Sequence, residues 1–128
     1  MTPRLVEHLT RTYQRELALY SEVLDLVESE YDALVRGRPL ADIIPSFERK
    51  RDLLQRIERL DRAVAHEKSD LERGRRAVPS IETVDLARTI ESVRCIVGKI
   101  IDLESRNESE LIRQAQNASA VESPGVGA

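Results

Sequence analysis

The fold class of this chain is decided by residues 17–34, LALYSEVLDLVESEYDAL. Apolar and aromatic residues recur there at alternating intervals of three and four: Leu17, Tyr20, Leu24, Val27, Tyr31 and Leu34. Side chains at these intervals line one face of an α-helix, so the segment is predicted to pack lengthwise against other helices. Val6, Thr10 and Tyr13 extend the pattern backwards. A second seam of the same kind contains Leu86, Ile90, Val93, Val97, Ile100, Glu104, Asn107 and Leu111.

The amino-acid composition favours one elongated helical domain. The 128 residues suffice for one shared core, which must be built from Leu, Ile and Val because the chain has three Tyr, one Phe and no Trp. Charged residues make up 34% of the chain, which fits long exposed helix faces. A net charge of −3 argues against nucleic acid as a partner. Residues 48–76 carry ten Lys and Arg against seven Asp and Glu. Because the flanking segments are acidic, this predicts that helices of opposite charge bias lie against one another.

Cysteine usage and hydropathy indicate the compartment. Cys95 is the single cysteine, which excludes an internal disulfide and fits a reducing environment. Its neighbours Ile96 and Val97 are apolar, so Cys95 is predicted to be a small core residue. The sequence shows neither an apolar signal core at its start nor an apolar run as long as a membrane span. We therefore expect a soluble, cytoplasmic protein that does not insert into membranes.

Start and stop signals predict three helices, over residues 3–36, 40–74 and 82–116. Thr2 suits the N-cap of the first helix, Pro3 its first turn, and Gly37 the left-handed conformation that ends it. The second helix begins either with Asp42 as N-cap and Pro45 in the first turn, or after a short turn over 39–44.

The third helix is expected to be capped by Ser80 or Thr83. After residue 116 the chain is small and polar, so 1–116 is predicted to be the helical domain and 117–128 a disordered C-terminal tail. The expected fold class is all-α, an elongated antiparallel three-helix bundle or coiled coil with short turns. The predicted core contains Leu24, Val27, Leu34, Leu54, Ile57, Val93 and Val97.

Residues that could support catalysis are scarce. His8 and His66 stand alone, without partners at metal-ligand spacing, and are predicted to be surface residues. A nucleophilic Cys95 would need a base and a polarised pocket, which its neighbours do not offer. Basic and acidic residues alternate after residue 48, unlike a DNA-binding basic helix. The sequence thus predicts no enzyme activity, no metal site and no cofactor.

Two polar residues, Glu104 and Asn107, occupy positions of the last seam where apolar residues are expected. Either they fix the register inside a bundle, or the last helix outruns its partners and offers a mixed surface to another chain. In the second case the partner-binding residues are predicted to be Leu103, Asn107, Leu111 and Ile112. The sequence leaves both interpretations open.

The stretch from Tyr20 to Leu60 resembles the flagellar export chaperone FlgN family. The resemblance rests on Leu24, on Glu30-Tyr31-Asp32-Ala33-Leu34, on the turn at Gly37, and on Lys50 followed by Leu53-Leu54 and Leu60. Residues 101–112 are similar to the closing segment of the family, with Asn107 matching the first of its two asparagines. Glu110 stands where the second is expected, so the chain departs from the family pattern there.

The resemblance implies binding without catalysis, by a helical chaperone-like domain over 1–116. Members of the family hold the C-terminal segments of hook-associated (hook–filament junction) proteins and escort them to the flagellar type III export gate and its ATPase complex. Such segments are amphipathic and unfolded before assembly, so a groove that covers them reversibly would keep them from self-associating. The alternative is a generic coiled-coil adaptor or scaffold protein, self-associating or not, with no export role. The sequence does not specify the oligomeric state.

Overall fold

The computed structural model describes residues 3–73 and 81–127, with side chains placed over 4–70 and 83–118. This part of the chain is all-α, without strands, as predicted from the seams. Its elements are α1 (Pro3–Val35), the 3₁₀ turn η1 (Leu40–Asp42), α2 (Ile44–Ala63), α3 (Ala65–Arg73) and α4 (Ile81–Gly127). The described residues therefore form four α-helices, where the sequence predicted three.

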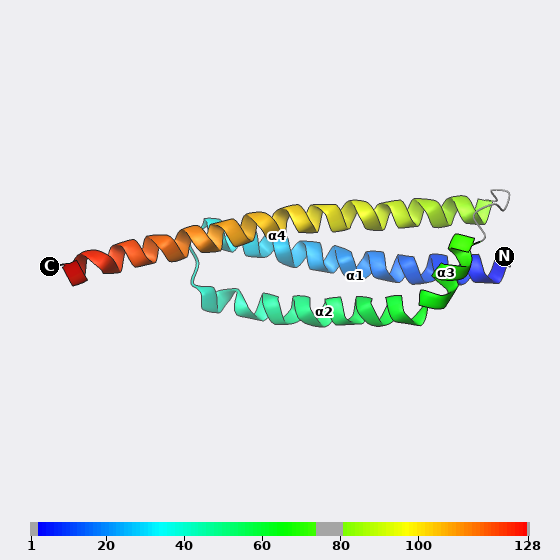
Figure 1. The fold of residues 1–128 in the computed structure, drawn as a ribbon, viewed down its shortest axis with the longest axis horizontal. Coiled ribbons are helices and arrows are strands. Elements are labelled where there is room, and N and C mark those ends of the chain that lie inside the picture. Colours follow the sequence, from blue (N-terminus) through cyan, green and yellow to red (C-terminus); the bar gives the residue numbers. More distant parts are fainter. Residues whose placement is uncertain (1–2, 74–80, 128) are drawn as a thin grey trace.

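The three long helices, α1, α2 and α4, lie along one axis and form a rod with α1 at its centre, and the short α3 turns across that axis at one end (Figure 1). α1 packs along α4 and also against α2, so both of these helices rest on the same support. α2 runs antiparallel to α1, whereas α4 runs parallel to it. With 33 residues, α1 is about 50 Å long at 1.5 Å per residue. The C-terminal part of α4 projects beyond the ends of α1 and α2.

Two side-chain amides hold α1 and α4 in a constant register. Asn107 Nδ2 donates a hydrogen bond to the Val27 carbonyl oxygen at 3.2 Å, and Gln114 Nε2 donates to the Leu34 carbonyl oxygen at 2.5 Å. Both pairs are separated by 80 residues, and both members advance by seven, which is two helical turns. The parallel pair thus repeats the same polar contact at one heptad spacing.

The core has two clusters, one toward each end of the rod. The first contains Val6, Leu9, Val64 and Leu86, and the second contains Val23, Val27, Leu53 and Ile57. The first cluster combines α1 residues with Val64, which lies between α2 and α3, and the second combines α1 residues with α2 residues. α4 contributes Leu86 and Ile90 to the first cluster and Ile100 and Leu103 to the second. Aliphatic side chains at helical spacing therefore join all three long helices.

Three of the predicted core residues, Val27, Leu34 and Ile57, are buried, while Leu24, Val93 and Val97 are half-buried. The prediction for Leu54 is wrong, because its side chain is 44% exposed and the neighbouring Leu53 is fully buried instead. Adjacent residues point about 100° apart around a helix, so an error of one position moves a side chain out of the core.

The prediction for Cys95 is also wrong, since this residue is exposed on α4. It follows Val93 and precedes Val97 in the seam, so the helix turns it away from α1. His8 and His66 are exposed, as predicted.

Gly37 follows the end of α1 as predicted, with a φ of +70° that glycine adopts without strain. Its N–H and that of Arg38 bond to the carbonyl oxygens of Leu34 and Ala33, which completes the last turn of α1. Of the two predicted starts for the second helix, the structure has the short turn. η1 precedes α2, Ile43 occupies the N-cap position and Pro45 lies in the first turn, so Asp42 is not the cap.

The continuous second helix predicted over 40–74 is wrong, because Val64 interrupts it. Val64 leaves the helical conformation with φ −112° and ψ 9°, and α3 begins directly afterwards. The interruption lets Val64 bury its side chain, which is 1% exposed, among Val6, Leu9 and Leu86. Burial of this aliphatic side chain against α1 and α4 offsets the lost helical bonds.

α4 continues as one helix to Gly127, so it does not end at the predicted residue 116. The reason for the wrong boundary is that small residues such as Ala and Ser, although they have nothing to bury, still permit helical geometry. α4 begins at Ile81, which places Thr83 inside the helix and not at its cap. Thr2 and the predicted connection over 74–80, including Ser80, lie outside the described residues.

Candidate functional site

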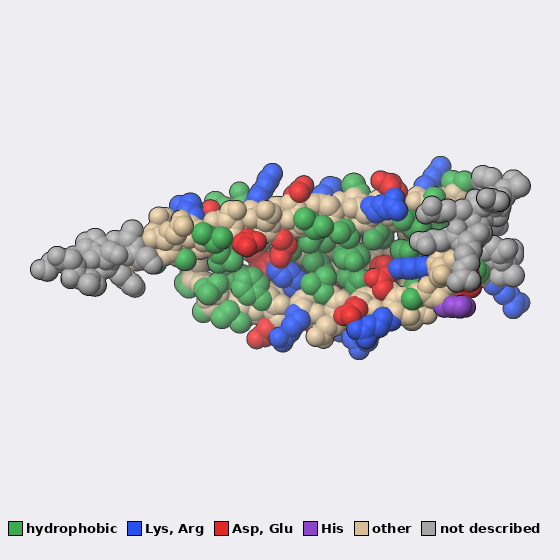
Figure 2. Space-filling model, viewed as in Figure 1, with side chains coloured by type: hydrophobic (Ala, Val, Ile, Leu, Met, Phe, Trp, Pro, Cys, Tyr) green, Lys and Arg blue, Asp and Glu red, His purple; other side chains and the backbone are tan. Residues whose placement is uncertain are grey.

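A groove of about 430 Å³ runs between α2 and α4, and α1 forms its floor. We call it the central groove. Its apolar lining consists of Leu34, Phe47, Ile100, Ile101 and Leu111. Its polar lining consists of Glu30, Lys50, Glu104, Ser105, Asn107 and Glu108. Figure 2 shows apolar side chains gathered between the two outer helices, with charged side chains among them.

Helical spacing brings these residues to one place. Glu30 and Leu34 are four apart on α1, and Phe47 and Lys50 are three apart on α2, so each pair shares a helix face. On α4, four successive seam positions (100, 104, 107 and 111) follow the groove. Because α2 rests on α1 and not on α4, the side chains of α2 and α4 face each other across the opening.

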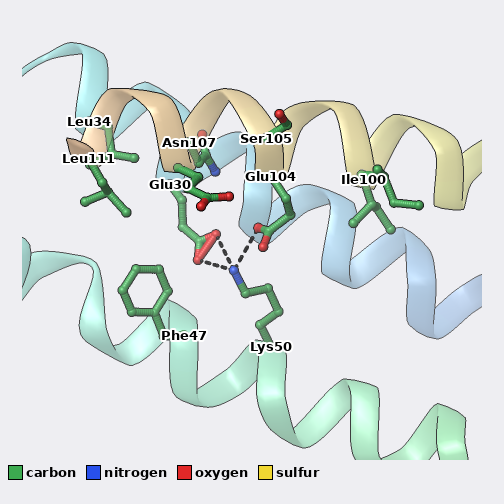
Figure 3. Close-up of a pocket in the computed structure, with 11 residues that line it drawn as sticks. Glu30, Leu34, Phe47, Lys50, Ile100, Glu104, Ser105, Asn107 and Leu111 are labelled. Atoms are coloured by element: carbon green, nitrogen blue, oxygen red, sulfur yellow. Dashed lines mark hydrogen bonds and ion pairs between the residues drawn. The ribbon is translucent and has the colours of Figure 1, made fainter. Parts of the chain in front are cut away.

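Lys50 crosses the groove and joins the three helices (Figure 3). Its Nζ lies 2.8 Å and 3.0 Å from the two carboxylate oxygens of Glu30 and 2.8 Å from Oε1 of Glu104. The side chain of Glu30 is 1% exposed and that of Lys50 14%, whereas Glu104 remains 42% exposed. One ammonium therefore faces two carboxylates, so these three side chains together carry a net negative charge. Glu104 is the solvent-exposed member of the three.

The protonation of this group follows from burial and pairing. Burial alone would lower the pKa of Lys50, but its hydrogen bonds to Glu104 and Glu30 outweigh burial and raise the pKa above its ordinary value. Burial raises the pKa of Glu30, and the hydrogen bond from Lys50 opposes that rise. Lys50 also lies 5.0 Å from the centre of the Phe47 ring, a cation–π contact. The ammonium is thus held charged at a fixed point of an otherwise apolar groove.

The four residues predicted to bind a partner are only partly brought together. Asn107 and Leu111 line the central groove. Asn107 is buried between α1 and α4 through its bond to Val27, which fits the register-fixing interpretation for this residue. Leu103 packs against the second core cluster. Ile112 is 51% exposed and is not part of the groove lining.

The sequence analysis did not single out Glu30, Phe47 or Lys50 as one site. For Glu30 a signal was present, because it stands seven residues after Val23 and four before Leu34, and both are buried. A carboxylate at that spacing faces inward and needs a cation, and the facing helix offers Lys50. That pairing, however, depends on how α2 is placed against α1, which the sequence does not give.

A second buried polar cluster lies near the end of α2. Glu16 is 2% exposed and its carboxyl group is hydrogen-bonded to Asp61, whose Oδ1 accepts a bond of 2.6 Å from Lys68 Nζ. Lys68 also sits 4.8 Å above the Tyr13 ring. Burial, reinforced by the neighbouring Asp61, raises the pKa of Glu16 to about 8, so Glu16 holds a proton at neutral pH and donates it to Asp61.

In the part of the chain that the structure describes, no three His, Cys, Asp or Glu side chains are grouped as metal ligands. None of the described helices has the length and apolar character that a bilayer crossing requires. Comparisons with protein families, with curated proteins and with solved structures found no match to this chain.

Proposed function

We propose that this protein is a flagellar type III export chaperone of the FlgN-like kind. It binds the amphipathic C-terminal segment of a hook-associated protein in the central groove and escorts it, in the cytoplasm, to the export gate and its ATPase complex. It works as an elongated antiparallel three-helix bundle, in which α2 and α3 are together the second helical segment along the chain and α1 lies at the centre. It performs no catalysis and needs no cofactor.

The observation that carries this proposal is the apolar lining of the central groove beside exposed aliphatic side chains. Ile101 is 62% exposed although it lines the groove, and Leu111 is only half-buried. Such side chains gain free energy when a partner covers them, at roughly 25 cal/mol per Å² of apolar surface. Two roughly parallel walls above a helical floor suit an amphipathic helix that presents apolar residues at i, i+3, i+4 and i+7.

The residues that carry the family resemblance support the same site. Glu30 and Leu34 come from the first matching stretch, Lys50 from the second, and Asn107 and Leu111 from the third. These stretches lie far apart in the sequence, yet all five residues line the central groove. A shared partner is a physical reason for such residues to meet.

The charges in the groove specify the chemistry of the partner. Glu104 is the solvent-exposed member of a group with one ammonium and two carboxylates. A partner helix is therefore expected to interrupt its apolar stripe with one Lys, Arg or Gln side chain at this level. Its apolar residues would then cover Phe47 and Leu111 on one side and Ile100 on the other.

The test is isothermal titration calorimetry with a synthetic peptide from the C-terminus of a hook-associated protein of the same organism. Ile101→Asp should weaken binding at least tenfold, because it places a charge against the apolar partner, and Leu111→Asp should abolish it. Ile112→Asp is the matched control, since it puts the same charge on the same helix outside the groove and should leave binding unchanged.

Circular dichroism separates binding from folding. Ile101 is exposed in the free protein, so Ile101→Asp should leave helicity and melting temperature nearly unchanged. Equal effects of Ile101→Asp and Ile112→Asp would remove the central groove as the site. A folded wild-type protein that binds no hook-associated peptide would overturn the export role in favour of a scaffold.

A further inference from the structure

A second groove lies between α1 and α2 and is separate from the central groove. It contains two hollows, and among the described residues both are lined by α1 and α2 alone. The first hollow has a volume of about 500 Å³ and an apolar floor of Ala18, Leu19 and Leu60. The second has a volume of about 240 Å³ with Leu26 and Leu53 in its lining. We call the two together the outer groove.

The outer groove is charged oppositely at its two ends. The first hollow is bordered by Arg15, Arg56 and Arg59, of which Arg56 is already paired with Asp52 at 3.3 Å. The second is bordered by Glu22 and Asp25, with Arg49 as its one cation. Arg49 is already shared between Glu22, at 3.8 Å, and Asp52, at 3.2 Å. The end of the outer groove with Arg15 and Arg59 is therefore positive, and the end with Glu22 and Asp25 is negative.

A uniformly charged partner does not fit this arrangement. An acidic peptide, a nucleic acid or an anionic membrane would meet Glu22 and Asp25 after passing the arginines, and like charges at that distance repel. The partner must instead carry negative charge at one end and positive charge at the other. A second copy of the outer groove, placed antiparallel to the first, has this charge distribution.

We propose that a second copy of this chain docks on the outer groove in antiparallel orientation, forming a two-fold dimer. In a two-fold interface the same patch is used by both copies, so the patch must be complementary to itself. Arg15 and Asp25 are each five residues from position 20 of α1. An axis that crosses α1 there brings Arg15 of each copy next to Asp25 of the other.

The apolar residues also match across this axis. Because Leu19 lies one residue from position 20, it contacts Leu19 of the second copy. Leu60 borders the first hollow, so the rotation carries it to the second hollow, which Leu26 and Leu53 line. Arg59 faces the counterpart of Glu22 in the same way. The apolar floor is small beside that of a permanent interface, so the dimer is expected to dissociate in the micromolar range.

Sedimentation velocity from 2 to 400 µM of the full chain tests the proposal. The wild type should dimerise at tens of micromolar at about 50 mM salt and less at about 500 mM, because exposed ion pairs are screened. Arg15→Glu should weaken dimerisation at least tenfold, since each copy then faces Asp25 with a like charge. Asp25→Arg should do the same. Arg94→Glu, an exposed reversal on α4, is the matched control and should have no effect.

The decisive measurement combines the two variants. An equimolar mixture of Arg15→Glu and Asp25→Arg should form a heterodimer, because Glu at 15 then meets Arg at 25. The double variant should dimerise with itself for the same reason. This recovery also shows that neither variant failed merely because it was misfolded. A wild type that stays monomeric to 400 µM, or a mixture that does not recover dimerisation, overturns the proposal.

Discussion

Replacing the buried acid Glu16 by Gln should change how the stability of this protein depends on pH. The pKa of Glu16 is raised from its ordinary value of 4.5 to about 8 in the folded chain. The folded state thus holds the proton more tightly than the unfolded state. This contribution to stability is complete below pH 4.5 and is lost as the pH rises to 8. The loss is about 1.4 kcal/mol per pH unit for one proton.

Between pH 5 and pH 8 the wild type should therefore lose about 3 kcal/mol, allowing for some entry of water around the ionised group. Asp61 does not interfere in this window, because its lowered pKa confines its own effect to pH values below 3.8. Gln has the shape of the protonated acid and can still donate to Asp61, so Glu16→Gln should match the wild type at pH 5. At pH 8 it should be more stable by about 3 kcal/mol.

Urea unfolding followed by circular dichroism at pH 5, 6, 7 and 8 measures the effect. Comparing the two proteins at each pH removes the contribution of groups that do not interact with Glu16. Glu28→Gln, which removes an exposed acid from the same helix, is the matched control. The reasoning fails if the stability difference between Glu16→Gln and wild type is the same at pH 5 and pH 8.

Three further substitutions test packing and backbone geometry by urea unfolding. Leu53→Ala should cost about 2–5 kcal/mol because Leu53 is fully buried, and Leu54→Ala less than about 1 kcal/mol; equal costs would reject the register of α2. Lys50→Met should cost about 3 kcal/mol because it leaves the Glu30 carboxylate buried without a cation, and adding Glu30→Gln should restore at least half; no restoration would show that the charge is not the cause. Gly37→Ala should cost about 1 kcal/mol through its positive φ alone, since the space around Gly37 is open, and an unchanged midpoint would contradict this.

The sequence was sufficient for those features that depend on local spacing. The alternation of three and four residues predicted the helical face of α1 with Val27 and Leu34 buried, and Gly37 predicted its end. These depend on the geometry of one helix and one turn, both of which are local properties. The proline at 45 likewise restricted the start of α2 to two possibilities, one of which is present.

Features that depend on how helices sit against one another could not be predicted. Leu53 and Leu54 are chemically identical, and only contact with Val23 and Val27 selects Leu53 for the core. Val64 has no helix-breaking chemistry, and the helix is interrupted where Val64 is buried with Leu9 and Leu86, a contact that depends on the placement of other helices. The Lys50 site joins three helices, so no single stretch of sequence contains its geometry.

The parallel register of α1 and α4 has a consequence for the order in which the chain folds. Lys50 and Glu30 are 20 residues apart, whereas the contacts between α1 and α4 join residues 80 apart. Closing the longer loop costs about 1.2 kcal/mol more in chain entropy, so the α1–α2 hairpin is expected to form first. During synthesis at about 5–20 residues per second, α2 is complete at Ala63, roughly 2–10 s before Leu111 is added. For that interval the strip of α1 that α4 later covers is bare, which makes it the part of the nascent chain most exposed to wrong association.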